Sequence, residues 1–265
     1  GSEMCIRDRV NIVIELIGGS SGTAYKLVKK SLMNGKNVIT ANKALLAVHG
    51  NELIKLAEKN NCSISFEAAI AGGIPIVKVI RENLRFNNIS KVYGILNGTC
   101  NYILTKMETE GKDFNSVLKV AQNLGFAELD PSFDIKGIDA AHKITLLSSL
   151  AFNVPISFSS TFIEGIQGIE IDDFNLASEF GYKIKLLGIA KKQGNFYEQR
   201  VHPCMIRSDS EIAKVDNELN AVVVEDEVIG KTTLIGPGAG AGPTGAAVSA
   251  AVSYTHLTLP TIYSV

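Results

Sequence analysis

Short apolar runs alternate with amphipathic stretches over the first 70 residues of the chain. Residues 10–19 (VNIVIELIGG) are typical of a buried strand that ends in a glycine turn. Residues 23–36 (TAYKLVKKSLMNGK) have the apolar spacing of a helix that stops at Gly35. The same order of strand, helix and strand is predicted for residues 37–43, 44–60 and 62–68. This alternation predicts a parallel, doubly wound sheet with right-handed crossovers.

The pattern changes after residue 73. Helices are predicted for residues 76–84, 100–111, 114–125 and 139–152, around a strand-like segment at residues 89–97. Four more strand-like segments follow at residues 182–193, 196–207, 220–226 and 230–236. This order fits a second domain of α+β type, with helices packed on a mixed sheet. No linker composition separates the two parts, so we expect a joint near residues 65–73 and not a flexible tether.

Composition narrows the class of protein. The 265 residues are 46% hydrophobic and 20% charged, with a formal net charge of −1, as in ordinary globular proteins. No apolar run approaches the roughly 20 residues that span a bilayer, and no secretory signal is recognisable. Lys and Arg form no basic stripe, which argues against a nucleic-acid partner. We therefore expect a cytoplasmic protein with no membrane or nucleic-acid partner.

The two ends of the chain differ in character from the rest. Residues 2–9 (SEMCIRDR) and 252–261 (VSYTHLTLPT) resemble out-of-frame translations of sequencing-adapter DNA. We therefore expect residues 1–9 and 252–265 to be non-native tails and residues 10–251 to be the natural segment. The four cysteines form no CxxC pair, so neither a zinc site nor a disulfide framework is predicted.

Ionisable residues stand at the start of the helix predicted for residues 139–152. Asp139 and Lys143 lie one helical turn apart, just ahead of the apolar stretch ITLLSSLAF, and Glu128 and Asp130 lie in the preceding loop. On spacing alone, Asp139 and Lys143 are an i,i+4 ion pair on a surface helix, worth about 0.2–0.5 kcal/mol. A functional pair is the alternative.

Eight sequence blocks occur in an order and at spacings that resemble the homoserine dehydrogenase family. The blocks are ELIGG, TANKALLAVHG, EAAIAGGIP, ILNGTCNYILTKM, GFAELDPSFDIKGIDAAHK, KLLGIAK, VHP and GPGAGAGPT. They cover essentially all of residues 10–251. The resemblance implies an oxidoreductase that interconverts L-homoserine and L-aspartate 4-semialdehyde with NAD or NADP, in threonine and methionine biosynthesis.

The resemblance also implies a domain order. Residues 10–67 would be the C-terminal part of a Rossmann-type dinucleotide domain, in keeping with the doubly wound pattern. Residues 68–235 would form an α+β catalytic and dimerisation domain, through which a homodimer is expected. Residues 236–251 would be a return segment to the first domain.

Reduction of an aldehyde by hydride leaves an alkoxide, so the site needs a proton donor. The resemblance implies that Lys143, in DAAHK, is that donor. It places Lys43, in TANK, between cofactor and substrate as a second catalytic candidate. Glu128 and Asp139 would bind the substrate ammonium, although each could instead be a helix-capping or dipole-pairing acid.

Two further sets of contacts are implied by the resemblance. The cofactor would contact Lys43, Gly18, Gly19, Gly125 and Gly240. A structural, sodium-like monovalent cation would be held by Glu67, Ile70, Gly72 and Ile74. Oxygen ligands suit such a hard cation, but the EAAIAGGIP segment could also be a plain interdomain turn.

Some features of the sequence leave alternatives open. The family's opening strand and phosphate-binding glycine turn are not found ahead of residue 10, so we expect weak NAD(P)H binding, and the choice between NAD and NADP stays open. The chain could be a non-catalytic dimerisation module or an inactive fragment. A semialdehyde oxidoreductase of another kind would need a nucleophilic cysteine, for which Cys100 is the candidate. Asp130 and Asp134 are expected to be solvated, and His142 to be packed away from Lys143.

Overall fold

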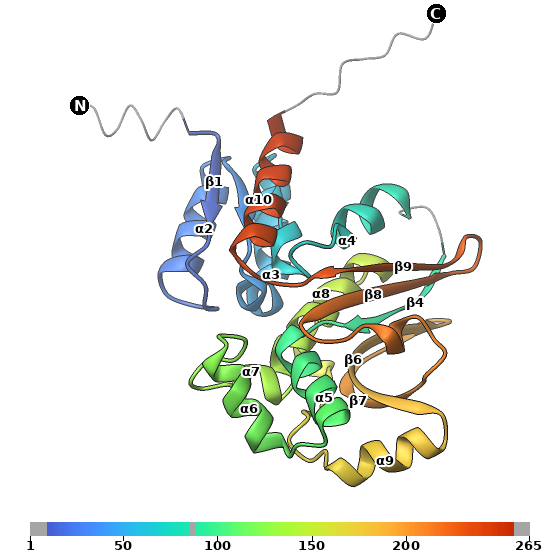
Figure 1. Cartoon of the computed structure of the whole chain (residues 1–265). Coiled ribbons are helices and arrows are strands. Elements are labelled where there is room, and N and C mark those ends of the chain that lie inside the picture. The colour runs from blue at the N-terminus through green and yellow to red at the C-terminus, as the bar shows by residue number, and fades with distance from the viewer. Residues whose placement is uncertain (1–9, 85–87, 257–265) are drawn as a thin grey trace, which may run out of the picture.

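The computed structural model describes residues 10–84 and 88–256, which form two sheets (Figure 1). The first sheet has the parallel strand order β1-β2-β3. Its elements are β1 (Ile12–Glu15), α2 (Thr23–Met33), β2 (Asn37–Thr40), α3 (Lys43–Lys59) and β3 (Ile64–Ser65). The predicted alternation of strands and helices is confirmed, including the stop of α2 just before Gly35, whose φ of 65° favours glycine.

The second sheet has six strands in the order β5-β7-β6-β4-β8-β9. Its strands are β4 (Ile89–Ile95), β5 (Phe162–Ile163), β6 (Tyr182–Gln193), β7 (Phe196–Arg207), β8 (Leu219–Asp226) and β9 (Gly230–Pro237). Among the described strands of this sheet, only β5 and β7 pair in parallel. The mixed sheet expected after residue 73 is therefore confirmed, and β6 and β7 have the predicted bounds.

Helices cover one face of this sheet, with α8 and α5 lying against it (Figure 1). The helices are α5 (Gly98–Glu110), α6 (Phe114–Asn123), α7 (Ser132–Ile135), α8 (Ile138–Phe152) and α9 (Ile171–Glu179). Short 3₁₀ turns occur at η1 (Glu67–Ala69), η3 (Phe158–Ser160) and η4 (Ile212–Lys214). The helix predicted for residues 76–84 differs in detail, because a single α turn, α4 (Ile76–Lys78), continues as the π-helical η2 (Val79–Asn83).

Helix α8 joins the two halves of the molecule. It packs on β6 on one side and on α3 of the first sheet on the other. Gly188 of β6 permits this approach, because a Cβ atom there would lie 3.1 Å from the Cβ of Ile144. With Asp139 4% exposed and Ala141 and Ile144 completely buried, the start of α8 lies inside the molecule and not on its surface.

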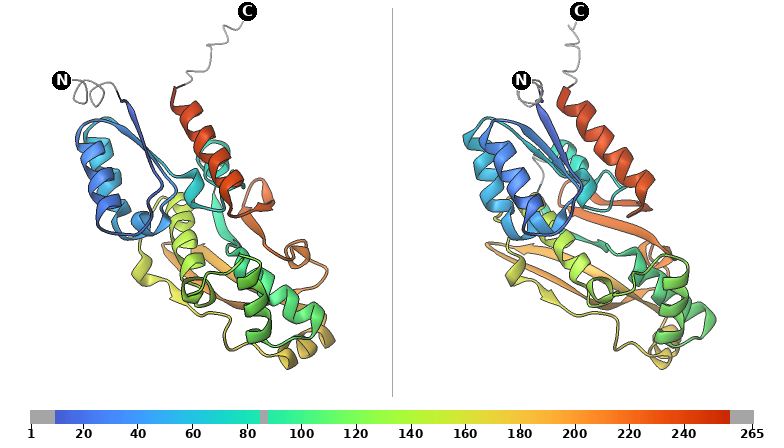
Figure 2. Two further views of the ribbon diagram at one scale, coloured as in Figure 1. Left: turned by 60° about the vertical axis from the view of Figure 1, so that its left-hand side comes forward. Right: turned by 90° about the vertical axis from the view of Figure 1, so that its left-hand side faces the viewer.

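The chain returns to the first sheet at its end. After β9, helix α10 (Ala241–His256) lies alongside the three-stranded sheet (Figure 2), and Val248 and Ala251 pack against Ile39 of β2. The helix continues past the boundary expected at residue 251. The other residues assigned to non-native tails, 1–9 and 257–265, lie outside the described residues, so that interpretation stays a prediction. None of the helices in the described part is long and apolar enough to cross a membrane.

Candidate active site

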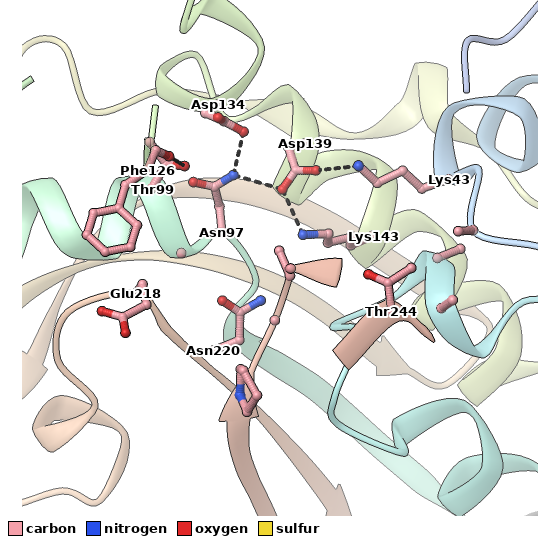
Figure 3. Close-up of a pocket in the computed structure, with 18 of the residues that line it drawn as sticks. Lys43, Asn97, Thr99, Phe126, Asp134, Asp139, Lys143, Glu218, Asn220 and Thr244 are labelled. Carbon is pink, nitrogen blue, oxygen red and sulfur yellow. Dashed lines mark hydrogen bonds and ion pairs between the residues drawn. The ribbon is translucent and has the colours of Figure 1, made fainter. Parts of the chain in front are cut away.

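A pocket of about 590 Å³ opens where the two sheets meet (Figure 3). Its walls come from the β2–α3 connection, the N-terminus of α5, the loop before α7, the start of α8, the start of β8 and the return segment at residues 237–244. Because parallel sheets bind ligands at the carboxyl ends of their strands, the β2 side of this pocket is the position expected for a cofactor.

Asp139 lies between two lysines in this pocket. Its Oδ2 accepts a hydrogen bond from Lys143 Nζ at 2.8 Å, and its Oδ1 is 3.1 Å from Lys43 Nζ. The side chains of Asp139 and Lys143 are 5% and 8% exposed, and that of Lys43 is 30% exposed. Burial opposes ionisation of Asp139, but the charges of Lys143 and Lys43 outweigh it and hold the pKa of this carboxyl well below its usual range. The structure thus brings together three of the predicted site residues.

Lys143 is held in one orientation. Besides Asp139, its Nζ donates to the carbonyl oxygen of Leu96, at 2.7 Å. An ammonium has three N–H donors, so one remains for a ligand in the pocket. Spacing alone suggested an ion pair on the protein surface. In the structure the pair of Asp139 and Lys143 is buried and its orientation is fixed.

Asn97 was not singled out in the sequence, although it orders the site. Its Nδ2 lies 2.8 Å from both Asp134 Oδ1 and Asp139 Oδ2, and its Oδ1 accepts from the backbone N–H of Cys100 as the N-cap of α5. The only sequence signal was the Asn-Gly-Thr that precedes a helix, which is typical of a cap.

The expectation that Asp134 is a solvated loop residue is wrong. Asp134 lines the pocket and bonds to Asn97, because the short helix α7 turns it inward. Burial, with the charge of Asp139 nearby, raises the pKa of Asp134. Asp130 is exposed as expected, and its carboxylate accepts from the backbone N–H of Ser132.

Glu128 lies in the loop between α6 and α7 and lines the pocket. Its backbone carbonyl accepts from Gln122 Nε2 at 3.0 Å, which fixes the loop. Within the described residues, its carboxylate makes no hydrogen bond or ion pair and is exposed. A free carboxylate at this position can accept a cation, and its proposed role with substrate stays a prediction.

The predicted cofactor glycines occupy two places. Gly125 and Gly240 line the pocket. Gly18 and Gly19 follow β1 outside its lining, with φ angles of 85° and 80° that favour glycine. The buried carboxylate of Glu15 accepts from Gly18 N at 3.1 Å, which orders this turn at the carboxyl edge of the sheet.

The predicted cation segment spans η1 and the turn before α4. One carboxylate oxygen of Glu67, Oε2, is buried and has no hydrogen-bond partner among the described residues. Burial raises the pKa of Glu67. Ile70 and Ile74 are buried, and a Cβ atom on Gly72 would lie 3.0 Å from the carbonyl oxygen of Gly238. The segment therefore touches the return segment, and it leaves a carboxylate oxygen open for a ligand.

Cys100 and His142 do not have catalytic surroundings. Cys100 is completely buried, its Sγ donates to the carbonyl of Asp134 at 3.2 Å, and burial raises its pKa well above the usual value. It is therefore a protonated structural thiol and not a nucleophile. His142 packs between Phe133 and Phe158, as expected, and burial lowers its pKa.

Comparison with known proteins places this geometry in a family. The family model described as homoserine dehydrogenase matches residues 75–252, and the model described as its NAD binding domain matches residues 2–67. The homoserine dehydrogenase of Neisseria gonorrhoeae is 50% identical over 248 residues, and that of Pseudomonas aeruginosa is 48% identical over 248 residues. In both cases the match covers 94% of this chain and 57% of the relative.

Solved structures agree with these matches. A homoserine dehydrogenase from Thiobacillus denitrificans superposes with a TM-score of 0.92 at 47% identity, over 96% of this chain and 61% of that one. A hyperthermophilic archaeal homoserine dehydrogenase in complex with NADPH superposes with a TM-score of 0.81 at 31% identity, over 94% of this chain and 72% of that one. The chain thus spans a little over half the length of the curated relatives. It belongs to the homoserine dehydrogenase family.

Proposed function

We propose that the protein interconverts L-homoserine and L-aspartate 4-semialdehyde with NAD or NADP. The observation that carries this proposal is the carboxylate of Asp139 between Lys143 and Lys43, in a pocket bounded by a dinucleotide-type sheet on one side and a second domain on the other. We propose a cytoplasmic location for this activity.

Lys143 supplies the proton in this proposal. The chemistry that NAD(P)H would supply when bound is a hydride for the aldehyde carbon. Lys143 directs its remaining N–H toward the carbonyl oxygen, which gains negative charge as the reaction proceeds, and transfers a proton to it. Its bonds to Leu96 and Asp139 set the direction of that N–H. Because Lys143 is buried, few water molecules compete for the position.

Asp139 acts through the two lysines and not on the substrate ammonium in this proposal. Oδ2 is engaged by Lys143 and Asn97 and Oδ1 by Lys43, so the carboxylate keeps only one open acceptor position, on Oδ1. Glu128 has an unengaged carboxylate in the same pocket and is the better partner for an ammonium. Asp134 lines the same pocket.

The residues fit a nicotinamide cofactor. The pocket lies within the roughly 300–1,000 Å³ range of small-molecule sites. Gly125, Gly240 and Lys43 border it, and Gly18 and Gly19 stand at the carboxyl edge of the parallel sheet. These residues would hold the nicotinamide side of the cofactor.

We also propose a structural monovalent cation at Glu67, with main-chain oxygens of Ile70, Gly72 and Ile74. The unpartnered, buried Oε2 of Glu67 supports it, because a buried carboxylate oxygen without a donor is costly unless a cation or hydrogen bond satisfies it.

A homodimer through the second sheet is proposed as well. Helices α5 and α8 cover one face of this sheet, whereas the described residues place only η4 and its loop on the other. Tyr93, Ile206 and Ile235 are partly or largely exposed on that second face. An apolar sheet face of this kind is a common protein interface.

The test is an assay of homoserine-dependent reduction of NAD⁺ and NADP⁺, followed by NAD(P)H absorbance, with Lys143→Ala as the inactive reference. Ligand-observed NMR with NADPH measures binding separately, down to weak affinities. Binding without turnover in the wild type would favour a non-catalytic role, and absence of both would overturn the proposed function.

A further inference from the structure

Asn220, in β8, has a buried side-chain amide without a partner. The residue is 1% exposed, and neither Nδ2 nor Oδ1 forms a hydrogen bond within the described part of the chain. Buried polar groups are almost always hydrogen-bonded, because an unpaired amide loses its hydration without compensation. Asn220 nevertheless lines the pocket, below Lys143 in Figure 3. The missing partner is therefore expected from a ligand.

The return segment and α5 confine this amide. A Cβ atom on Gly238 would lie 2.0 Å from Asn220 Nδ2, so the amide lies against the glycine and would have to shift for any other residue type there. On its other side, a Cβ atom on Gly98 would lie 3.6 Å from Asn220 Oδ1. The amide thus stands at the border between the return segment and the N-terminus of α5.

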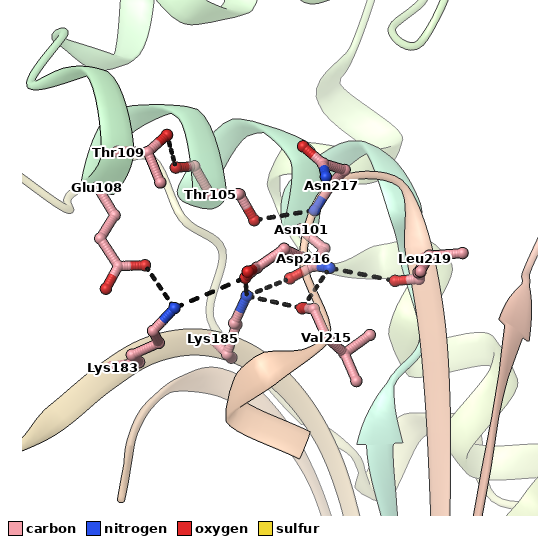
Figure 4. Close-up of polar contacts among 10 residues, drawn as sticks. All are labelled: Asn101, Thr105, Glu108, Thr109, Lys183, Lys185, Val215, Asp216, Asn217 and Leu219. Atoms are coloured by element: carbon pink, nitrogen blue, oxygen red, sulfur yellow. Dashed lines mark hydrogen bonds and ion pairs between the residues drawn. The ribbon is translucent and has the colours of Figure 1, made fainter. Parts of the chain in front are cut away.

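A buried polar cluster fixes the segment that leads into Asn220 (Figure 4). Asn101 Nδ2 donates to the carbonyls of Val215 and Leu219, at 3.0 Å and 3.1 Å. Lys185 Nζ donates to the carbonyl of Val215 at 2.8 Å and to Asp216 Oδ1 at 2.9 Å. Because residues 215–219 are tied in this way, the Asn220 backbone is held in place and its side chain is preorganised.

The chemistry of the amide selects its ligand group. An amide offers one acceptor and one NH₂ donor, side by side and without charge. The charged ends of an amino-acid substrate are better matched by the charged groups of the pocket, Lys43, Lys143, Glu128 and Asp134. A neutral carboxamide, in contrast, can form two hydrogen bonds with a neutral amide at once.

We propose that Asn220 binds the carboxamide of the nicotinamide ring, with Nδ2 donating to the carboxamide oxygen and Oδ1 accepting from its NH₂ group. This inference rests on the proposed function. The pairing fixes the rotation of the ring in the pocket, beside Lys143. Asn220 is thus a cofactor-binding residue contributed by the second domain.

The test compares ligands that differ at the carboxamide alone. Dissociation constants for NADPH and for its reduced 3-acetylpyridine counterpart, which carries a methyl ketone in place of the carboxamide, are measured by ligand-observed NMR. Wild-type protein should prefer NADPH by about tenfold, the effect of one lost hydrogen bond. Asn220→Leu, of similar shape but without polar atoms, should bind both ligands with nearly equal affinity.

Two further variants complete the design. Asn88→Ala removes an exposed asparagine that bonds to Glu227 at the far end of β8, and should keep the wild-type preference. Asn220→Asp keeps the size and the acceptor but loses the donor to the carbonyl oxygen that both ligands carry, so it should bind both ligands more weakly and keep the preference for NADPH. The melting temperature of Asn220→Leu should equal or exceed that of the wild type, because the Asn220 amide has no hydrogen-bond partner in the unliganded protein. A clear loss of stability would instead assign the amide a structural role.

The outcomes separate this inference from the proposed function. An unchanged preference in Asn220→Leu, or loss of the preference in Asn220→Asp, with both ligands still bound, would overturn the pairing and leave the proposed function standing. Failure of the wild-type protein to bind either dinucleotide would overturn both.

Discussion

Asp139 and Lys143, one turn apart at the start of α8, form a 2.8 Å ion pair in which both side chains are less than one-tenth exposed. A buried charge is stable only when its partner is held close, so the pair constrains both residues. Lys43 adds a second cation to the same carboxylate from the other domain. The ion pairs therefore connect the helix that follows β2 of the dinucleotide-type sheet to Lys143 through Asp139.

Lys143→Ala should lower kcat by about 100-fold or more, with NADPH affinity little changed, because proton donation acts in the transition state. Steady-state kinetics and NADPH titration measure the two quantities. Lys106→Ala, which removes a partly exposed lysine of α5, is the control and should have a near-normal kcat. Near-normal turnover in Lys143→Ala would indicate that Lys43, and not Lys143, donates the proton.

Glu128→Gln should raise KM for homoserine by about tenfold, the effect of one charged hydrogen bond on an ammonium, and leave cofactor affinity unchanged. Asp130→Asn, in the same loop but outside the pocket, is the matched control. Homoserine titrations at saturating cofactor measure KM for both variants. An unchanged KM in Glu128→Gln would mean that Glu128 does not bind the substrate ammonium.

Asp139→Asn should lower the free energy of unfolding by about 3–5 kcal/mol at neutral pH, because it leaves the buried Lys143 without a counter-charge. The folded-state pKa of Asp139 lies below its ordinary 3.8, so this contribution is fully present above that pH and is lost as pH falls below it. Urea unfolding of both proteins at about pH 7 and about pH 3 should show the difference shrinking at the lower pH. An equal difference in unfolding free energy at the two pH values would contradict the lowered pKa of Asp139. Asp209→Asn, which removes an exposed partner of Arg207, should change little.

Glu67→Gln tests the cation site. Burial raises the pKa of Glu67, so without a cation its ionised form weakens the fold as pH rises past the ordinary value of 4.5. In choline chloride the variant should melt about 2–4 °C above wild type. Sodium chloride at the same ionic strength should stabilise wild type and not the variant. Equal responses of the two proteins to sodium would argue against the site.

Local spacing along the chain determined most of the elements. Strands β6 and β7 are long apolar-rich segments whose bounds follow from sequence. Helix α7 has four residues and α9 nine, too short for a periodic pattern to stand out, and neither was predicted. The π-helical turn at residues 79–83 was not predicted either, since an α-helix and a π-helix share the same apolar residues over one turn.

Sequence blocks in order were also enough to indicate the family, and with it Lys143, Lys43, Glu128 and Asp139 as candidates. Spacing could not show whether the i,i+4 pair of α8 is exposed or buried, because that depends on α3 and β6 packing around the helix. Nor could it show which oxygens of Asp139 are already engaged.

By itself, then, the sequence determined most of the elements, the two-part architecture and the residues with the right chemistry, since these depend on neighbours along the chain. Only the tertiary structure decided that Asn97 joins Asp134 to Asp139, 37 and 42 residues away, and that Asn220 lies in the pocket without a partner. The physical reason is that burial and hydrogen-bond satisfaction are properties of the packed chain. A side chain's partners are set by segments that come together only on folding.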